Sequence, residues 1–247
     1  MPQARADQAL ETETARLLEP GHLQLGTALE FQTSPNGEEY AIPMAIEFGL
    51  LKNLELMIEP VAFTSIQPRS GRAANGAGDL ESSLAYLVFD ERRILPAMAL
   101  AGEVKFPTAQ NLQIGSGEFD YRLYLIASKR IGPVDLHFNV GYNIIGQPPG
   151  VHTQNPIDLE LAGEWFVNEK FDLFAEVTYT GSSGSSFDAG EGTDPGGGGV
   201  TSEISGKEIV GSVGVRAHLT RRLDLFGSFS YDNNNAKLIR TGITLKF

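Results

Sequence analysis

Charged and amide side chains recur at every second position in segments whose other positions are apolar. Between residues 134 and 144, for instance, Asp135, His137 and Asn139 alternate with apolar residues. Alternate side chains of an extended chain share one face, so they would line a common polar wall. Such a wall could order water and select solutes, or supply proton carriers and ligands. The residues assigned to it are Glu47, Glu59, Glu103, Lys105, Asp120, Arg122, His137, Asn139, Glu160, Glu176, Arg216 and Arg240.

This wall carries both signs of charge. Its carboxylates could form an acidic side that faces a basic cluster of Lys105, Arg122, Arg216 and Arg240, which would orient water and select solutes. The alternative is a set of solvated, mutually neutralising pairs that select little. The sequence leaves both arrangements open.

Nucleophilic catalysis would need a nucleophile hydrogen-bonded to a histidine that a third group orients. His137 lies near Asp135 on the predicted polar face, but no serine stands two residues away. An inward histidine beside an aspartate is more often a structural hydrogen bond, so we predict no catalytic residue.

Metal and cofactor binding also find little support. No cysteine is present, and the histidines lie on separate segments without metal-ligand spacing: His22, His137, His152 and His218. Asp188, Glu191 and Asp194 in a Gly-rich stretch could hold calcium, but acidic Gly/Ser loops are usually only solvated. No phosphate-binding glycine motif precedes a helix. We predict no metal and no cofactor.

The alternation of polar and apolar residues predicts about twelve strands of near ten residues, which would carry these side chains. The last ends on Phe247, in phase with Ile243 and Leu245. An even number of strands this long fits an all-β, antiparallel up-and-down transmembrane barrel. The predicted strands cover 22–31, 40–50, 54–64, 80–89, 94–106, 119–127, 134–144, 157–167, 171–180, 207–219, 223–231 and 237–247.

Connections between these segments alternate in length, as in bacterial barrels with short periplasmic turns and longer outer loops. Short ones lie at 51–53, 90–93, 129–133, 168–170 and 220–222; longer or turn-rich ones lie at 32–39, 65–78, 107–117, 145–156, 181–206 and 232–235. Aromatic residues near strand ends on the apolar face predict two interfacial girdles. They are Tyr40, Phe48, Tyr142, Trp165, Phe171, Tyr179, Tyr231 and Phe247.

A soluble β-protein is the alternative, because its strands also alternate, with the apolar face inside. The many charges on the polar face argue against it, since a closed core would leave them desolvated. The net charge of −12 excludes a basic surface for nucleic acid. No stretch of eighteen apolar residues predicts a transmembrane helix.

Residues 1–20 differ from the barrel region, 21–247. Leu10, Thr14, Leu17 and Leu18 have helical spacing, and Pro20-Gly21 would end such a helix. We predict a periplasmic leader, helical or disordered, with a plug or partner-binding segment as the alternative. The start lacks the apolar core of a signal peptide, which favours a mature form over a cytosolic chain.

Several stretches resemble the outer-membrane family known as MetA-pathway phenol-degradation proteins. They are Pro20-Gly-His-Leu-Gln-Leu, Gly76-Ala-Gly-Asp79, Lys105-Phe-Pro-Thr108, Gly115-Ser-Gly-Glu-Phe-Asp120 and His137-Phe-Asn-Val-Gly-Tyr142. The chain departs from the pattern after Thr108, where Ala-Gln replaces the usual glycine. The resemblance implies a barrel that passes small molecules, aromatic or hydrophobic ones among them. It implies no catalytic residues.

We therefore expect a channel or transporter with a narrow or partly occluded polar lumen in the outer membrane of a Gram-negative cell. The alternatives are a structural or adhesive barrel acting through loop 181–206, and a membrane-embedded hydrolase of the outer-membrane phospholipase type. Expected partners are membrane lipid and lipopolysaccharide, a small-molecule solute, and the barrel-assembly machinery, which would bind the strand ending in Phe247.

Overall fold

The structure, a computed structural model, describes residues 9–148, 151–183, 186–187 and 207–247. Its long strands coincide with the stretches of period-two alternation, because such a strand suits a sheet between two different media. The strands are β1 (Leu23–Thr33), β2 (Gly37–Leu51), β3 (Leu54–Pro68), β4 (Ala74–Gly76), β5 (Leu80–Phe89), β6 (Ala97–Phe106), β7 (Asp120–Ile131), β8 (Val134–Ile144), β9 (Val151–His152), β10 (Ile157–Phe166), β11 (Phe171–Thr180), β12 (Ser186–Phe187), β13 (Glu208–His218), β14 (Leu223–Asp232) and β15 (Lys237–Lys246).

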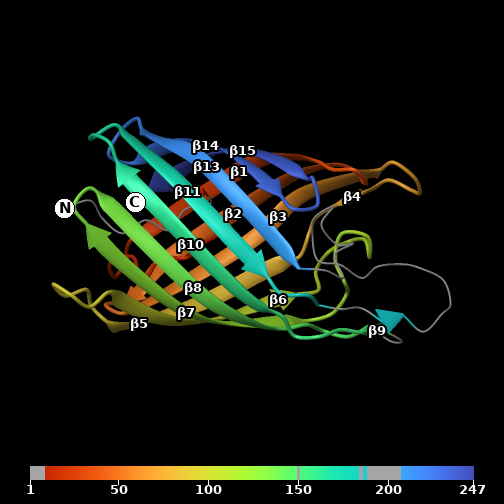
Figure 1. Ribbon diagram of the computed structural model, residues 1–247, viewed down its shortest axis with the longest axis horizontal. Helices are drawn as coiled ribbons and strands as arrows, with labels where there is room; N and C mark the ends of the chain where they lie inside the picture. The colour runs from red at the N-terminus through yellow and green to blue at the C-terminus, as the bar shows by residue number, and fades with distance from the viewer. Residues whose placement is uncertain (1–8, 149–150, 184–185, 188–206) are drawn as a thin grey trace.

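Twelve long strands close into one antiparallel barrel (Figure 1). Each pairs with the next long strand along the chain, and β1 pairs with β15 to complete the ring, with Leu25 opposite Leu245. Closure leaves no unpaired sheet edge, which hydrocarbon surroundings require. The predicted all-β, up-and-down barrel of about twelve strands is confirmed.

Three short strands lie outside the ring. β4 adds to β3, and β9 and β12 form a separate two-stranded sheet. Among the residues that the structure describes, no helix is long and apolar enough to cross a membrane.

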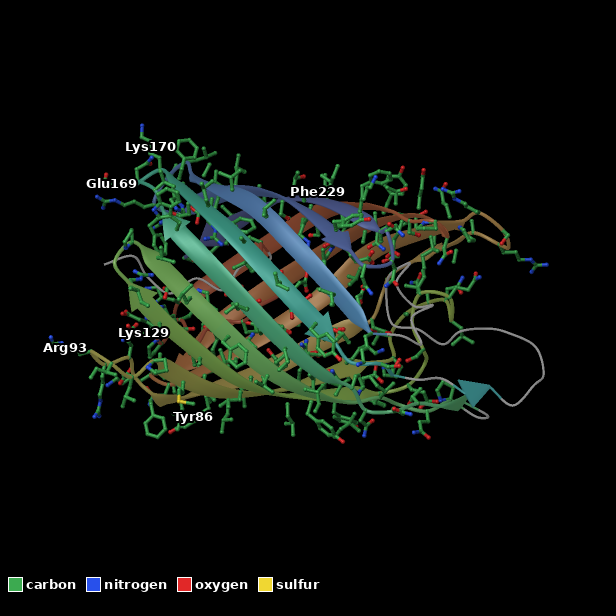
Figure 2. The ribbon with its side chains drawn as sticks, viewed as in Figure 1. Tyr86, Arg93, Lys129, Glu169, Lys170 and Phe229 are labelled. Atoms are coloured by element: carbon green, nitrogen blue, oxygen red, sulfur yellow. The ribbon has the colours of Figure 1, made fainter. Side chains whose placement is uncertain are left out.

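Large apolar side chains cover the outside of the barrel. Leu161 and Val213 are 55% and 58% exposed, whereas their neighbours Ala162 and Ser212 are buried. Figure 2 shows Tyr86 pointing away from the barrel wall, and Tyr86 is 52% exposed. The soluble alternative requires the opposite orientation, with apolar side chains packed inside. The arrangement instead matches a barrel that lipid surrounds.

The barrel has two different ends. At the turn end lie the connections 52–53, 90–96, 132–133, 167–170 and 219–222, together with Phe247; at the loop end lie the others. Figure 2 shows Arg93 and Lys170 at the turn end. The predicted alternation of lengths is only approximate. At the loop end the connection between β1 and β2 is only 34–36, shorter than the predicted 32–39. At the turn end the connection between β5 and β6 is 90–96, longer than the predicted 90–93.

The aromatic residues predicted for the girdles lie on the outer face. Tyr40 and Tyr142, near the loop end, are 41% and 44% exposed, and Trp165 and Phe171, near the turn end, are 50% and 46% exposed. Tyr40 also packs against Phe31, with ring centroids 4.8 Å apart. Their contact with a lipid interface stays a prediction.

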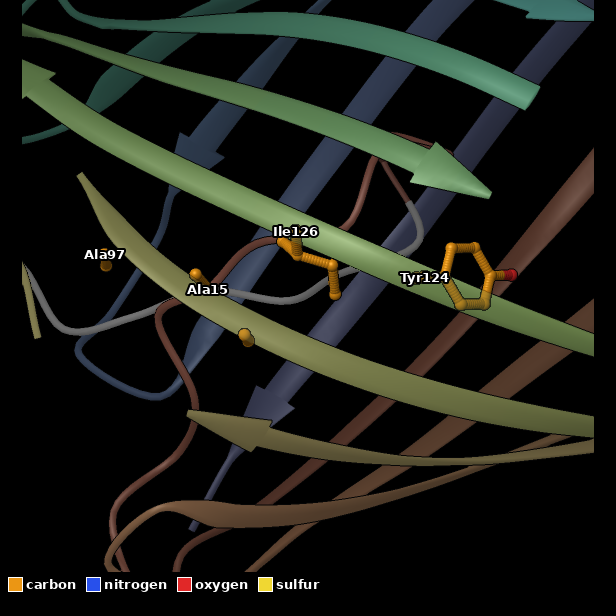
Figure 3. Packing of buried hydrophobic residues seen from close by; sticks show 5 residues of the cluster. Ala15, Ala97, Tyr124 and Ile126 are labelled. Atoms are coloured by element: carbon orange, nitrogen blue, oxygen red, sulfur yellow. The ribbon is translucent and has the colours of Figure 1, made fainter. Parts of the chain in front are cut away.

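The interior contains two small apolar clusters among its polar side chains. One consists of Ala15, Ala97, Ala99, Tyr124 and Ile126, and Figure 3 shows Ala15 beside the strands that carry the others. Ala15 comes from the N-terminal part of the chain, so part of that region lies inside the barrel.

The second cluster joins Ala9 and Ala28 to Phe174 and Phe226, with Leu10 packed against them. Glycines provide room for its rings. A Cβ at Gly214 would lie 2.3 Å from Phe174 Cζ, and one at Gly242 would lie 2.4 Å from Phe226 Cζ. These inward aromatic residues give the N-terminal region an apolar contact in an otherwise polar lumen.

Candidate functional site

Residues 9–20, here called the inner segment, run through the lumen as bends and turns. The helix that the spacing of Leu10, Thr14, Leu17 and Leu18 favours is not formed, and the segment is held more firmly than a loose leader. The physical reason is that barrel side chains, rather than the segment's own carbonyls, accept its backbone N–H groups. The spacing of residues within the segment does not reveal partners that lie elsewhere in the chain.

Three barrel side chains accept those N–H groups. Glu176 Oε2 accepts from the backbone nitrogens of Glu11 and Thr12 at 2.9 and 2.6 Å. Ser128 Oγ accepts from Ala15 N at 2.9 Å, and Glu55 Oε2 accepts from Leu18 N at 2.5 Å. The acceptors come from β11, β7 and β3, so the inner segment is tied to three different sides of the ring.

Ion pairs fix the inner segment at both its ends. Arg16 Nε lies 2.7 Å from Asp135 Oδ2, and its Nη2 lies 2.5 Å from Glu91 Oε2. Glu11 pairs with Arg240 on β15. The two Arg16 pairs are only partly exposed, so salt screens them less than it screens surface pairs.

The inner segment leaves the lumen at the turn end, where the chain passes close to β2. Gly21 N donates to Gly49 O at 2.8 Å, and Gly49 N donates to His22 O at 3.0 Å. A Cβ on Gly49 would lie 2.1 Å from Glu19 O, so only glycine allows this close approach.

Two carboxyl groups that contact or belong to the inner segment have opposite pKa shifts. Burial acts to raise the pKa of Glu91, but bonds from Arg16, Lys129 and the Arg130 N–H outweigh it and hold that pKa below its ordinary value. Burial first, and then the neighbouring carboxylates, raises the pKa of Glu13 to about 8. The attachment of the inner segment inside the barrel, here called docking, therefore depends on pH through both of these carboxyl groups.

The twelve residues predicted for the polar wall all lie on the inner side of their strands, and most are buried. The four cations do not form one basic cluster. Each is held by carboxylates from other strands, from the loop before β5 or from the inner segment, with two acidic partners around each of Lys105, Arg122, Arg216 and Arg240. The paired alternative is thus what the geometry shows at these four positions, and a role in solute selection stays a prediction.

Two of these ion-pair groups are buried to different extents. Arg216 is 1% exposed, with Nη1 3.1 Å from Glu164 Oε1 and 3.7 Å from Asp172 Oδ2. Arg122 is more accessible and contacts Glu160 and Asp158, the latter at 2.9 Å. The first group is part of the packed turn-end half of the lumen, whereas the second borders open space.

His137 has a serine partner that the sequence reasoning missed. Ser128 Oγ lies 2.9 Å from His137 Nδ1, because β7 continues past the predicted end at Ala127 and pairs Ser128 directly with His137. Ser128 is 0% exposed and also accepts the Ala15 N–H bond. A covered hydroxyl that holds a backbone group lacks the access that a nucleophile needs. The pair is part of the inner segment's attachment.

Three carboxylates from neighbouring strands lie together near the loop end. One oxygen each from Glu59, Glu81 and Glu103 lies within 4.8 Å of the other two, and Glu59 faces Glu81 directly across β3 and β5. Carboxylate oxygens are suitable calcium ligands. An acidic cluster alone does not identify a metal site. The other calcium prediction, at Asp188, Glu191 and Asp194, lies outside the described residues.

Among the cavities that the described residues border, two lie in the loop-end half of the lumen. The larger, of about 370 Å³, is bordered by β1, β2, β7, β10, β11, β13, β14 and β15 and by Ala9 and Glu11 of the inner segment. The smaller, of about 230 Å³, lies against β2 and β3 and meets the larger at Glu11, Glu30, Glu39 and Arg240. The inner segment forms part of the boundary of both cavities.

The wall beside the smaller cavity is less regular than the rest of the barrel. Pairing between β2 and β3 shifts at Pro43, and neither Pro43 nor Pro60 has an N–H to donate. Both prolines, with Met44 and Val61, border the cavity, and Met44 is 37% exposed on the outer surface. Carboxylates border the same cavity, including Glu39 and Glu59 on these two strands.

Solved structures with a similar fold include outer-membrane channels and porins. The COG4313 outer membrane channel from Pseudomonas putida F1 has a TM-score of 0.70 at 13% identity, over 98% of this chain and 100% of that one. The NanC porin has a TM-score of 0.61 at 11% identity, over 90% and 100%. The KdgM porin in complex with disordered oligogalacturonate has 0.57 at 10%, over 91% and 99%.

At these identities the likeness shows the fold alone. No curated protein matches the sequence. The family model described as "Putative MetA-pathway of phenol degradation" matches residues 8–235, which is most of the chain and includes the inner segment and nearly every strand. By this match the protein belongs to that family of outer-membrane-type barrels.

Proposed function

We propose that this protein is an outer-membrane channel that passes small solutes through a narrow, partly occluded lumen. The observation that carries the proposal is the pair of cavities inside a closed barrel, bordered by charged residues and by the inner segment. A barrel built only as a scaffold would have no need for so many desolvated charges along its interior.

The inner segment is the element that limits passage. It crosses the lumen between the cavities and the turn end, so a solute must pass beside it or displace it. Its attachments are hydrogen bonds and ion pairs rather than a large apolar core, and such contacts can be exchanged with water. Passage therefore depends on loosening a segment that bonds from several strands of the barrel hold in place.

The solute class follows from the cavity walls and from the family. The smaller cavity combines apolar contacts from Pro43, Met44 and Pro60 with carboxylates. A small aromatic or otherwise hydrophobic molecule with one polar group fits that combination. The family description refers to phenol degradation, which is consistent with such solutes.

Conductance across a planar lipid bilayer tests the proposal. The wild-type protein should give small steps of current in potassium chloride, and Arg16→Gln should give larger or longer ones, because it removes two ion pairs from the inner segment. Arg222→Gln changes the same residue type at an exposed position and should leave the current unchanged.

Absence of current in all three proteins would favour the structural or adhesive barrel. Equal effects of the two substitutions would show that the inner segment does not limit passage. Liposomes that carry folded protein, checked by the mobility shift of unheated barrels in electrophoresis, exclude misfolding as the cause of either result.

A further inference from the structure

The larger cavity has an uneven charge. Its border contains eight carboxylates and two guanidinium groups among the described residues. The carboxylates belong to Glu11, Glu30, Glu39, Asp158, Glu160, Glu176, Glu208 and Asp232, and the guanidinium groups to Arg122 and Arg240. The imbalance lies in the half of the lumen that a solute from the loop end meets first.

The two arginines are already engaged. Arg240 holds Glu11 and Glu30, and Arg122 holds Asp158 and Glu160. Each arginine thus forms ion pairs with two carboxylates. The one positive and two negative charges of each such group leave a net negative charge. The remaining four acidic residues on the border of the cavity are Glu39, Glu176, Glu208 and Asp232.

Glu208 and Asp232 contribute most directly at the loop end. They lie on adjacent strands, with Asp232 opposite Val210 and Glu208 two residues further along the same face. Asp232 Oδ1 caps the turn by accepting from Asn234 N and Ala236 N at 2.8 and 2.7 Å. Both carboxyl groups border the larger cavity, and they lie close enough to hydrogen-bond to each other.

A separate observation indicates that the protein does not satisfy this cavity by itself. Asp158 borders it and is only 5% exposed, yet its Oδ1 lacks a hydrogen-bond donor among the described residues. A buried carboxylate oxygen without a donor is costly, and a mobile cation or its hydration water would offset that cost.

We propose that this cavity makes the channel selective for cations over anions, with Glu208 and Asp232 as selectivity-determining residues. Walls of one sign in a narrow, low-dielectric cleft concentrate counter-ions and repel ions of the same charge. The inference rests on the proposed channel function and narrows its solutes to cationic and neutral molecules. Carboxylate and sulfonate solutes would be excluded even when their apolar part fits the smaller cavity.

Reversal potentials in asymmetric salt across a planar bilayer test the inference. The wild-type channel should favour K⁺ over Cl⁻ by about fivefold or more, as expected for a potential of more than one kT at the cavity wall. The same measurement with benzyltrimethylammonium chloride and with sodium benzenesulfonate compares two aromatic ions of fixed and opposite charge. The first should carry current, and the second should not.

A double variant then assigns the effect to residues. Glu208→Gln with Asp232→Asn replaces both carboxyl groups with neutral amides and keeps the turn-capping oxygen of residue 232, so cation preference should fall at least about twofold. The control, Asp90→Asn with Glu169→Gln, removes two carboxylates at exposed positions of the turn end and should keep the wild-type ratio.

The outcomes are distinguishable. Current with equal or anionic preference would overturn the charge selectivity while leaving the channel function intact. A cation preference that the double variant retains would overturn the assignment to Glu208 and Asp232. A complete lack of current from folded wild-type protein would overturn the channel function, and the selectivity with it.

Discussion

Arg216 shows how single residues stabilise a lumen full of charge. Its guanidinium group is almost fully buried and bridges Glu164 on β10 and Asp172 on β11, while Asp172 also accepts from His218 at 2.7 Å. A buried pair adds little net stability when complete, but removing one partner leaves the other as an uncompensated charge. Arg216 therefore stabilises the fold mainly by neutralising the buried carboxylates of Glu164 and Asp172.

Replacing Arg216 with methionine should lower the free energy of unfolding by about 3 kcal/mol, because two buried carboxylates lose their cation. Urea unfolding in lipid vesicles would measure this loss. Trp165, the one tryptophan of the chain, adjoins Glu164 and provides the fluorescence signal. Arg222→Met, at an exposed turn, should change stability by less than about 0.5 kcal/mol. Similar losses from both would contradict the buried-bridge role.

At the same residue scale, the sequence could predict which side chains face inward but not which of them pair. The register places Lys105 opposite both Glu81 and Asp120, and Lys105 contacts Asp120. It places Arg122 opposite Glu103, yet Arg122 contacts Asp158 and Glu160 on β10. Long cationic side chains reach several carboxylates at similar distances. Period-two alternation fixes the face of a residue and leaves that choice open.

At the scale of elements, strands were predictable and the inner segment was not. A strand reveals itself by alternation because lipid and lumen impose opposite preferences on its two faces. The inner segment has no such pattern: Thr12 bonds to Glu176, and Ala15 to Ser128, more than a hundred residues away. Its partners belong to the barrel, so only the closed fold shows where it lies.

The docking of the inner segment should weaken as pH rises from about 5 to about 8.5. Glu13 has an ordinary carboxyl pKa of 4.5 when undocked, and its pKa is about 8 when docked. The docked state thus holds a proton that the undocked state releases, and this contribution to docking is lost as pH rises through that range. Bilayer current should therefore increase with pH.

The bond between Arg16 and Glu91 does not change this direction. The lowered pKa of Glu91 keeps its carboxylate charged throughout the same range, and the pair weakens only at more acid pH. Glu13→Gln, which cannot lose a proton, should make the current depend less on pH between 5 and 8.5 than the wild-type current does. A variant with an unchanged pH profile would show that another group controls docking.

At the scale of the whole molecule, the barrel separates two media, and each strand must satisfy both. Its outer face carries large exposed apolar side chains, whereas the inner face carries charges, cavities and a segment of the chain's own N-terminal region. The same alternation in a soluble sandwich would place the apolar face inside. The solvent on each side, rather than the pattern itself, therefore distinguishes the two folds.

Adjacent positions on β13 allow a direct test of this separation. Val213 is 58% exposed on the outer face, and Ser212 borders the larger cavity on the inner face near Glu176 and Glu208. Val213→Arg should lower the free energy of unfolding in lipid vesicles by about 2–4 kcal/mol, since a charge would enter hydrocarbon. Ser212→Arg should cost less than about 1 kcal/mol, because the added guanidinium group remains among water and carboxylates.

The comparison distinguishes the two media because the substituted side chain, the strand and the depth in the membrane are nearly the same at both positions. Measured in detergent micelles with polar head groups, the difference between the two variants should shrink, since the thinner apolar layer lets the Val213→Arg side chain reach water. An equal cost at both positions in vesicles, or a larger cost for Ser212→Arg, would mean that lipid does not cover the outer face.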